Sequence, residues 1–420
     1  MLTSRERVIK AISHKEPDMV PIDFGGMDGS GGIHALALKK LLEYLRIKQG
    51  LEVRIYDVMQ MLGEIPKILL ERFEVDIVSV RRTIDPTGIS ANDIKFKDYI
   101  LSGEKMKIPE IVDITRKENG TEYMYAWFTK NPQKRRTVIA IRKPSAFYFD
   151  QLPIYTPLRE VEKASDIKEL PPHPAIPEYD RRYLEILRKN AKWLFENTSY
   201  AIFGMSGVSI FETTVYLLGF EKFAINLRRN KSVIERIIEL LLEHDKIELK
   251  KYLDAVGDYL QIIGIGGEDL GTQTAPLINP KDWRELFKPA IEEIVRIIKS
   301  RTNCYVLIHS CGSIKPFIPD FIDIKIDVLN PVQISAKDMN PQELKREFGD
   351  EISFWGGGCD TQRVLPRATP NEVKRHVKNL VEIFKPGGGF VFNQVHNIQP
   401  EVPPENIVAM FEAVKEVRKY

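Results

Sequence analysis

Short apolar stretches recur eight times along the chain, each followed by a polar or glycine-rich turn and then by a segment of helical period. Each stretch is almost continuously apolar, which is typical of a strand covered on both faces in a parallel sheet. The predicted strands are residues 20–24, 76–80, 200–203, 259–264, 304–308, 327–330, 352–355 and 390–393.

Amphipathic helices are predicted between these strands. Residues 231–252 place six aliphatic side chains on one stripe: Val233, Ile234, Ile237, Ile238, Leu241 and Leu242. Further helices are predicted at 4–14, 283–300, 341–347, 370–384 and 404–419, and proline opens three of them, as it prefers the first helical turn. Alternating strands and helices indicate a parallel α/β sheet, and eight units favour a closed (β/α)8 TIM barrel formed by residues 1–420 as one domain.

One stretch departs from this alternation. From about residue 88 to residue 142 the pattern reads as short strands separated by turns, and Asn119-Gly120 is a strong hairpin signal. We therefore predict a β-rich insertion on the barrel. The proline-rich residues 152–179 are predicted to form an irregular connection to the next helix.

Composition narrows the class of protein. The formal net charge is +2, from 61 basic and 59 acidic residues, which excludes the one-sided basic surface of a nucleic-acid binder. Three cysteines are too few for a disulfide framework and favour a reducing compartment. The amino terminus lacks the apolar core of a signal peptide, and no apolar run is long enough for a membrane span. We expect a cytoplasmic protein.

Candidate site residues follow from the predicted architecture, because barrel enzymes place their catalytic groups at the carboxyl ends of the strands. Polar residues occupy this position after seven of the eight predicted strands. They are Asp23, Arg81, Arg82, Glu268, Asp269, His309, Cys311, Asn330, Gln333, Cys359, Asp360, His396 and Asn397.

The sharpest chemical feature is His309-Ser310-Cys311, with Cys359 two strands further on. Imidazole and thiolate ligands suit zinc, and three protein ligands leave a fourth position for substrate. The bland alternative is that both cysteines are small buried hydrophobes and that His309 is a hydrogen-bonded core residue. Cys304 lies inside a predicted strand and is assigned to the core.

The other candidates carry structural alternatives as well. Glu268 and Asp269 either belong to the site or cap a helix, and His396 either faces the site or bonds a backbone carbonyl. Arg81 and Arg82 either bind a substrate carboxylate or form surface ion pairs. The glycines of residues 25–32 lack the spacing of a phosphate-binding motif.

These residues resemble the uroporphyrinogen decarboxylase superfamily, which includes the methylcobamide-dependent methyltransferases. The resemblance runs over nearly the whole chain and is carried by these segments: RERVIKAISHKEPDMVPIDF, GEDLGTQTAPLINPKDWRELFKP, HSCGSIKPFIPDFIDIKIDVLNPVQ, FWGGGCDTQRVLP and GGGFVFNQVHNIQPEVPPENIVAMFEAV. The superfamily fold is a (β/α)8 barrel, in agreement with the strand count.

Two departures separate the chain from true uroporphyrinogen decarboxylases. Their arginine-rich loop after the first strand reads DFGGMDGSGG here, and their aspartate after the second strand is replaced by Arg81 and Arg82. The methyltransferase branch holds zinc through His-x-Cys and a later Cys, a pattern that His309, Cys311 and Cys359 match. The additional acidic ligand of some relatives has no clear counterpart, and Gln333 lies near its place.

The resemblance implies a zinc-dependent methyltransferase that moves a methyl group between a corrinoid (cobalamin) on a partner protein and a thiol or another small acceptor. Glu268, Asp269, Asn330, Gln333, Asp360 and His396 would orient the reactants. Two alternatives stay open: a metal-free decarboxylase of a tetrapyrrole or a smaller carboxylate, anchored by Arg81 and Arg82, and a non-catalytic barrel that binds a corrinoid protein. Barrel enzymes of this size often form homodimers, and the sequence does not decide this point.

Overall fold

The computed structural model of the chain describes residues 2–47, 52–81, 95–127 and 136–420. A parallel sheet of seven strands, in the order β14-β13-β12-β11-β10-β9-β3, forms its centre. The strands are β3 (Ile77–Ser79), β9 (Ala201–Met205), β10 (Ile262–Ile265), β11 (Tyr305–His309), β12 (Val328–Asn330), β13 (Ser353–Trp355) and β14 (Phe390–Val391). Each of them overlaps one predicted apolar stretch.

The first predicted strand closes the barrel between β14 and β3. The amide of Phe392 donates to the Pro21 carbonyl (2.9 Å), and the amide of Asp23 donates back to the Phe392 carbonyl (2.8 Å). On the other side, the Asp76 amide donates to the Ile22 carbonyl (2.8 Å). Residues 20–24 thus take the eighth strand position of the barrel through a short β-bridge rather than a regular strand. The predicted (β/α)8 fold is confirmed.

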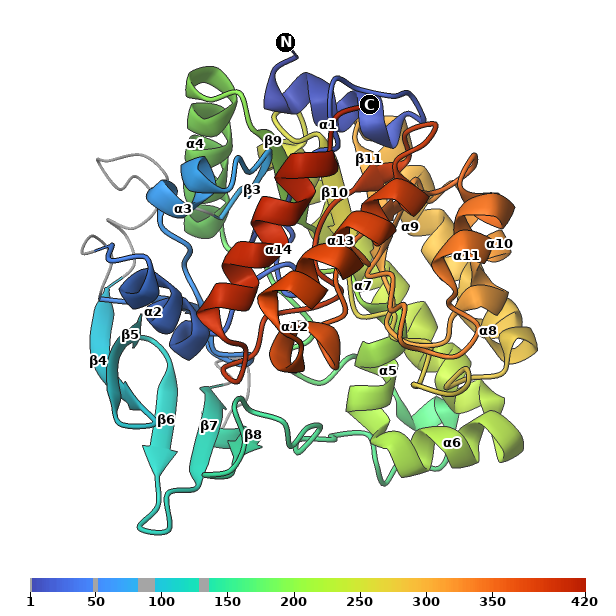
Figure 1. The fold of residues 1–420 in the computed structure, drawn as a ribbon. Coiled ribbons are helices and arrows are strands. Elements are labelled where there is room, and N and C mark those ends of the chain that lie inside the picture. The colour runs from blue at the N-terminus through green and yellow to red at the C-terminus, as the bar shows by residue number, and fades with distance from the viewer. Residues whose placement is uncertain (1, 48–51, 82–94, 128–135) are drawn as a thin grey trace.

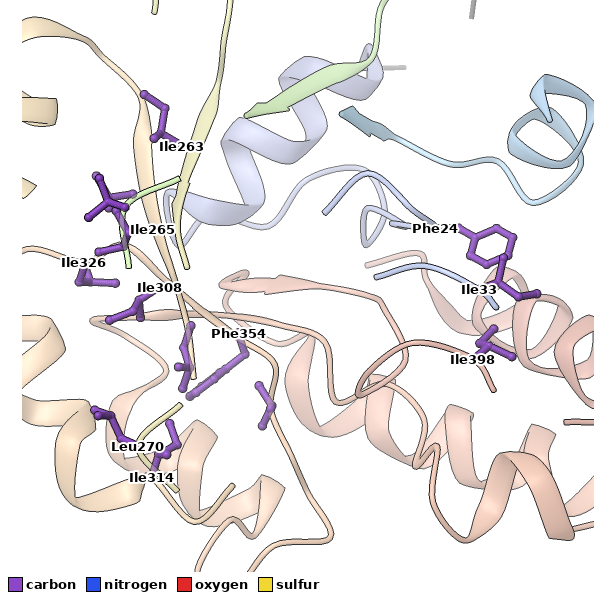
Figure 2. Close-up of a cluster of buried hydrophobic side chains, with 14 of the residues drawn as sticks. Phe24, Ile33, Ile263, Ile265, Leu270, Ile308, Ile314, Ile326, Phe354 and Ile398 are labelled. Atoms are coloured by element: carbon purple, nitrogen blue, oxygen red, sulfur yellow. The ribbon is translucent and has the colours of Figure 1, made fainter. Parts of the chain in front are cut away.

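The strands alternate between two apolar layers because successive side chains of a strand point to opposite faces. Ile262, Leu307 and Val328 face the barrel interior, where Trp355 and Phe203 pack with them. The residues next to them, such as Ile263 and Ile308, face outward and pack beneath the helices, as Figure 2 shows. The interior is therefore a packed core, as in other barrels of this kind.

Helices surround the sheet, and Figure 1 shows α13 and α14 lying across one flank of the barrel. Those that cover the strands or link to them are α1 (Ser4–Ile12), α2 (Ala35–Tyr44), α3 (Lys67–Arg72), α4 (Arg181–Asn197), α5 (Ile210–Leu218), α6 (Phe220–Arg229), α7 (Lys231–Val256), α8 (Pro280–Leu286), α9 (Lys288–Arg301), α10 (Ile318–Asp323), α11 (Pro341–Phe348), α12 (Val364–Arg367), α13 (Pro370–Phe384) and α14 (Pro404–Val417). Two single turns of 3-10 helix lie at Ala164–Asp166 and Lys315–Phe317. In the described ranges, none of the helices combines the length and the apolar character that crossing a bilayer requires.

Helix α1 closes the amino end of the barrel. It begins with a capping box of Thr3 and Glu6, and it places Val8 and Ile12 against the interior core. Its Arg7 is buried and bonds Asp18 (2.8 Å) and Asp76 (2.6 Å). The Asp76 carboxylate also accepts from the Ile22 amide (2.9 Å), so this ion cluster ties α1 to the seam where the barrel closes.

The insertion consists of two small antiparallel sheets. Strands β4 (Phe96–Leu101) and β5 (Glu104–Pro109) form a hairpin, and β6 (Asp113–Arg116), β7 (Glu122–Trp127) and β8 (Arg136–Arg142) form a three-stranded sheet. Asn119-Gly120 lies in the β6–β7 turn, as predicted. Buried Glu122 joins the two sheets by accepting from Tyr99 and Arg142. The β-rich insertion is confirmed where described, and residues 88–94 and 128–135 of its predicted range lie outside the described residues. A short pair, β1 (Ile55–Asp57) and β2 (Leu62–Gly63), lies near it.

Candidate metal centre

Three potential metal ligands meet at the carboxyl end of the barrel. His309 is the last residue of β11, Cys311 follows it, and His396 lies in the loop after β14. One ligand atom from each of the three side chains lies within 4.8 Å of the other two. Of the predicted triad, the structure thus brings His309 and Cys311 together, and it adds His396, which the sequence placed among the substrate-orienting residues.

The His309 ring is held in one orientation by Asn330. Its Nδ1 lies 2.9 Å from the Asn330 Oδ1, and the Asn330 Nδ2 donates to the Trp355 carbonyl (3.0 Å). This second bond sets which end of the amide faces the ring, so Nδ1 carries the proton and Nε2 presents a lone pair. A partner on the far nitrogen is the usual support of a metal-binding histidine. The structure therefore places Asn330 behind His309, which it orients.

Two loops are pressed together to place Asp269 beside Cys311. The Asp269 Oδ1 accepts from the Cys311 amide (2.8 Å) and lies 3.6 Å from the His309 Nε2. The approach requires glycine on both sides: a Cβ on Gly271 would lie 2.7 Å from the Cys311 carbonyl oxygen, and Gly312 has φ +90 against the Gly271 backbone. Burial and the neighbouring Asp269 carboxylate raise the pKa of Cys311 well above its usual value.

His396 approaches from the opposite side of the mouth. Its ring centroid lies 5.8 Å from that of His309, at an interplanar angle of 71°. Burial, followed by the influence of His309, lowers the pKa of His396 to about 4, so the ring is neutral near pH 7, the form that binds metals. With two imidazole nitrogens and a thiol sulfur within reach of one another, and the Asp269 carboxylate beside His309, the donor set fits zinc.

Cys359 lies outside this group of three. It is buried, and its Sγ lies 3.9 Å from the carbonyl oxygen of Asp360. The Cys359 carbonyl accepts from the Val395 amide (2.9 Å), which links the loop after β13 to the loop that carries His396. Asp360 accepts from the amides of Gln362 and Arg363, and so it orders the turn into α12.

The remaining predicted residues hold neighbouring structure. Glu268 is buried and accepts from the amides of Ile210 (2.8 Å) and Phe211 (3.1 Å), which caps α5, and burial raises its pKa well above the usual value. Gln333 accepts from the Gly312 amide (2.8 Å) and so supports the Cys311 loop. Arg81 lies 4.0 Å from Asp28, and Arg82 falls outside the described residues.

A cavity of about 650 Å³ lies in front of the cluster. Asp269, His309 and His396 line its polar end, and aromatic side chains from the connection after the insertion, including Tyr148, Phe149 and Tyr155, line its apolar wall. His173 stacks on Tyr155 with ring centroids 5.7 Å apart. Among the residues that the structure describes, no lysine or arginine lines this cavity.

Glu212 is the residue at this site that the sequence reasoning missed. It lies in the first turn of α5, the helix that follows β9, and it lines the cavity beside Asp269. Burial and the Asp269 carboxylate raise the pKa of Glu212 to about 8. The rule that directed attention to strand ends would have found it, because residues 206–212 follow the third predicted strand and none of them was considered.

Fold and site together define a (β/α)8-barrel protein with a candidate metal centre at the carboxyl end of its strands. The pattern of the family "Uroporphyrinogen decarboxylase (URO-D)" matches residues 153–417, well over half of the chain. The chain belongs to the uroporphyrinogen decarboxylase family.

Individual relatives are distant. A uroporphyrinogen decarboxylase from Pseudoalteromonas translucida is 33% identical over 78 residues, which is 19% of this chain and 21% of that protein. One from Pelodictyon phaeoclathratiforme is 25% identical over 172 residues, which is 40% of this chain and 44% of that protein. The matched segments thus span less than half the length of these curated relatives. A solved methyltransferase from Methanosarcina mazei shares the fold, with a TM-score of 0.57 and 16% identity over 99% of both chains.

Proposed function

We propose that the chain is a zinc-dependent methyltransferase that moves a methyl group between the corrinoid of a partner protein and a small acceptor, such as a thiol. The observation that carries the proposal is the meeting of His309, Cys311 and His396 at the polar end of an apolar cavity. Zinc bound there would keep an acceptor thiol ionised at neutral pH. The shared architecture of the Methanosarcina mazei methyltransferase supports the same class.

The chain's own residues have separable parts in this reaction. Asn330 keeps the His309 lone pair facing the centre, and Asp269 holds the Cys311 loop in register through its amide. The aromatic wall excludes water from the cavity and packs against the apolar part of a reactant. Zinc held by His309, Cys311 and His396 would supply an ionised acceptor sulfur to receive the methyl group, and the corrinoid of the partner protein would keep both electrons of the broken carbon–cobalt bond.

Decarboxylation of a tetrapyrrole, the activity in the names of the sequence relatives, fits the cavity less well. A substrate with many carboxylates needs cationic partners when it leaves water. The described lining instead carries Asp28, Glu212 and Asp269, and Arg81 lies beside Asp28 rather than facing the cavity.

The test follows the methyl–cobalt absorbance of methylcob(III)alamin incubated with the zinc-loaded protein and a panel of thiols. We expect methyl loss and an S-methyl product with the wild type and with Cys304→Ser, a matched control that changes a buried thiol remote from the site. Cys311→Ser should abolish both. Absence of methyl loss from the zinc-loaded wild type would refute the proposal, as would decarboxylation of uroporphyrinogen by the same preparation without methyl transfer.

A further inference from the structure

We infer that the metal centre contains one thiolate: His309, Cys311 and His396 bind the ion, the fourth position is left to the acceptor beside Asp269, and Cys359 is not a ligand. The inference rests on the proposed function only in requiring a metal at this site. It departs from the two-thiolate set that the sequence pattern suggested, and it can be tested by counting ligands, without any methyl donor.

The separations between ligand atoms already match the edges of a zinc tetrahedron. Zinc–nitrogen distances of about 2.0–2.1 Å and zinc–sulfur distances of about 2.3 Å place tetrahedral nitrogen and sulfur ligands about 3.6 Å apart, and nitrogen and oxygen ligands about 3.4 Å apart. The His309 Nε2 lies 3.5 Å from the Cys311 Sγ and 3.6 Å from the Asp269 Oδ1. Both separations from the His309 nitrogen are therefore close to those of tetrahedral edges.

His396 supplies the third ligand. Its ligand nitrogen lies within 4.8 Å of both the His309 and the Cys311 ligand atoms, so a modest movement of the side chain reaches a tetrahedral edge. The ring is partly exposed and lines the cavity, so an ion held there is open to a reactant.

Cys359 lacks these relations. The third member of the group is His396, and the Cys359 thiol is not part of it. Its link to the site runs through its backbone carbonyl, which accepts from the Val395 amide. Any residue supplies that carbonyl, so the thiol of Cys359 is dispensable for metal binding.

An alternative reading of the same contact is a simple hydrogen bond between the Cys311 thiol and the His309 ring, because 3.5 Å suits that bond as well. It leaves unexplained why a ligand nitrogen of His396 converges on the same place. Under that reading the protein would bind no ion at this place.

The experiment is zinc X-ray absorption spectroscopy on the wild-type protein loaded with one zinc per chain. We expect one sulfur and three nitrogen or oxygen neighbours, and the measurement requires no variant to fold. Zinc affinity is then measured by chelator competition for His396→Gln and Cys359→Ser, with circular dichroism to confirm folding. Losing a ligand should weaken binding by more than the about 10–100-fold that loss of a supporting hydrogen bond costs, whereas Cys359→Ser should stay within about twofold of the wild type.

A shell with two sulfurs, or a Cys359→Ser protein that loses zinc while His396→Gln retains it, would overturn the one-thiolate centre and leave the methyltransferase proposal standing. The converse result, a one-sulfur shell in a protein that moves no methyl group, would overturn the proposed function alone. Failure of the wild type to hold any zinc would overturn this inference directly.

Discussion

Replacing Asn330 by alanine should weaken metal binding without removing a ligand. The substitution deletes the acceptor of the His309 Nδ1 proton, and it also deletes the donor to the Trp355 carbonyl. The imidazole can then rotate, and its Nε2 lone pair no longer faces Cys311 in a fixed direction. Loss of the partner on the far nitrogen of a metal-binding histidine typically costs about 10–100-fold in metal affinity.

The magnitude follows from the contacts. A tenfold change corresponds to about 1.4 kcal/mol, so the expected loss of zinc-binding free energy is about 1.4–2.8 kcal/mol. Fold stability should fall as well, because the buried Trp355 carbonyl loses its side-chain donor, and an unsatisfied buried group costs about 1–3 kcal/mol. The two losses are measured separately, the first by chelator competition and the second by urea unfolding of the metal-free protein.

Ser30→Ala is the matched control. The Ser30 hydroxyl donates to the same Asn330 Oδ1 (2.7 Å), so its removal perturbs the buried network and leaves the Asn330–His309 bond in place. We expect zinc affinity within about threefold of the wild type for this variant, on the scale of one neutral hydrogen bond. Equal zinc affinities of Asn330→Ala and Ser30→Ala would refute the role assigned to Asn330.

Two further changes test the frame around the site. Arg7→Met leaves Asp76 buried without its nearest cation, which should cost about 3–5 kcal/mol in urea unfolding. Burial raises the pKa of Asp76 above its unfolded value, so the deficit should be small below the unfolded pKa, where the carboxyl is neutral, and grow as pH rises through the folded pKa. A deficit that shrinks with rising pH would contradict this account. Gly312→Ala combines a φ of +90 with a clash against the backbone of Gly271, whereas Gly103→Ala has a φ of +87 with open space around it. Both variants should lose about 1–2 kcal/mol of unfolding free energy to backbone strain, and only Gly312→Ala should also lose zinc affinity. Equal zinc affinities of the two variants would exclude a role for the close approach of Gly312 to Gly271.

The barrel was predictable because its signal is repeated and local. Seven apolar stretches became strands, since a strand buried on both faces leaves a continuous apolar run in the sequence. The first stretch, residues 20–24, behaves differently: it joins the barrel through a short bridge at Ile22 instead of a regular ladder. The apolar pattern indicates burial and not the regularity of hydrogen bonding. It therefore could not distinguish a regular strand from the single β-bridge at Ile22.

Parts of the site were predictable for a similar reason. Leu307 faces the barrel interior, so His309, two residues on, shares its face and points toward the axis. Val328 and Asn330 stand in the same relation on the next strand, and the two polar residues meet in a hydrogen bond (2.9 Å). The alternation of side chains along a strand therefore predicts which way His309 and Asn330 point, up to the last residue of each strand.

Beyond the rim the strand period ends, and this explains why the sequence selected Cys359 where the structure places His396. Trp355 faces the interior, and a continued strand would turn residue 359 to the same side. Gly356 and Gly357 instead have φ of +103 and +76, which breaks the alternation. The Gly358 amide then donates to the Asn393 carbonyl (2.8 Å), which binds this loop to the segment after β14. That neighbouring segment contains His396, whose imidazole lies with His309 and Cys311. Residue type and strand position thus led to the end of the barrel where the candidate ligands meet, while the turn that separates Cys359 from the group depends on two glycines whose backbone angles no hydrophobic pattern encodes.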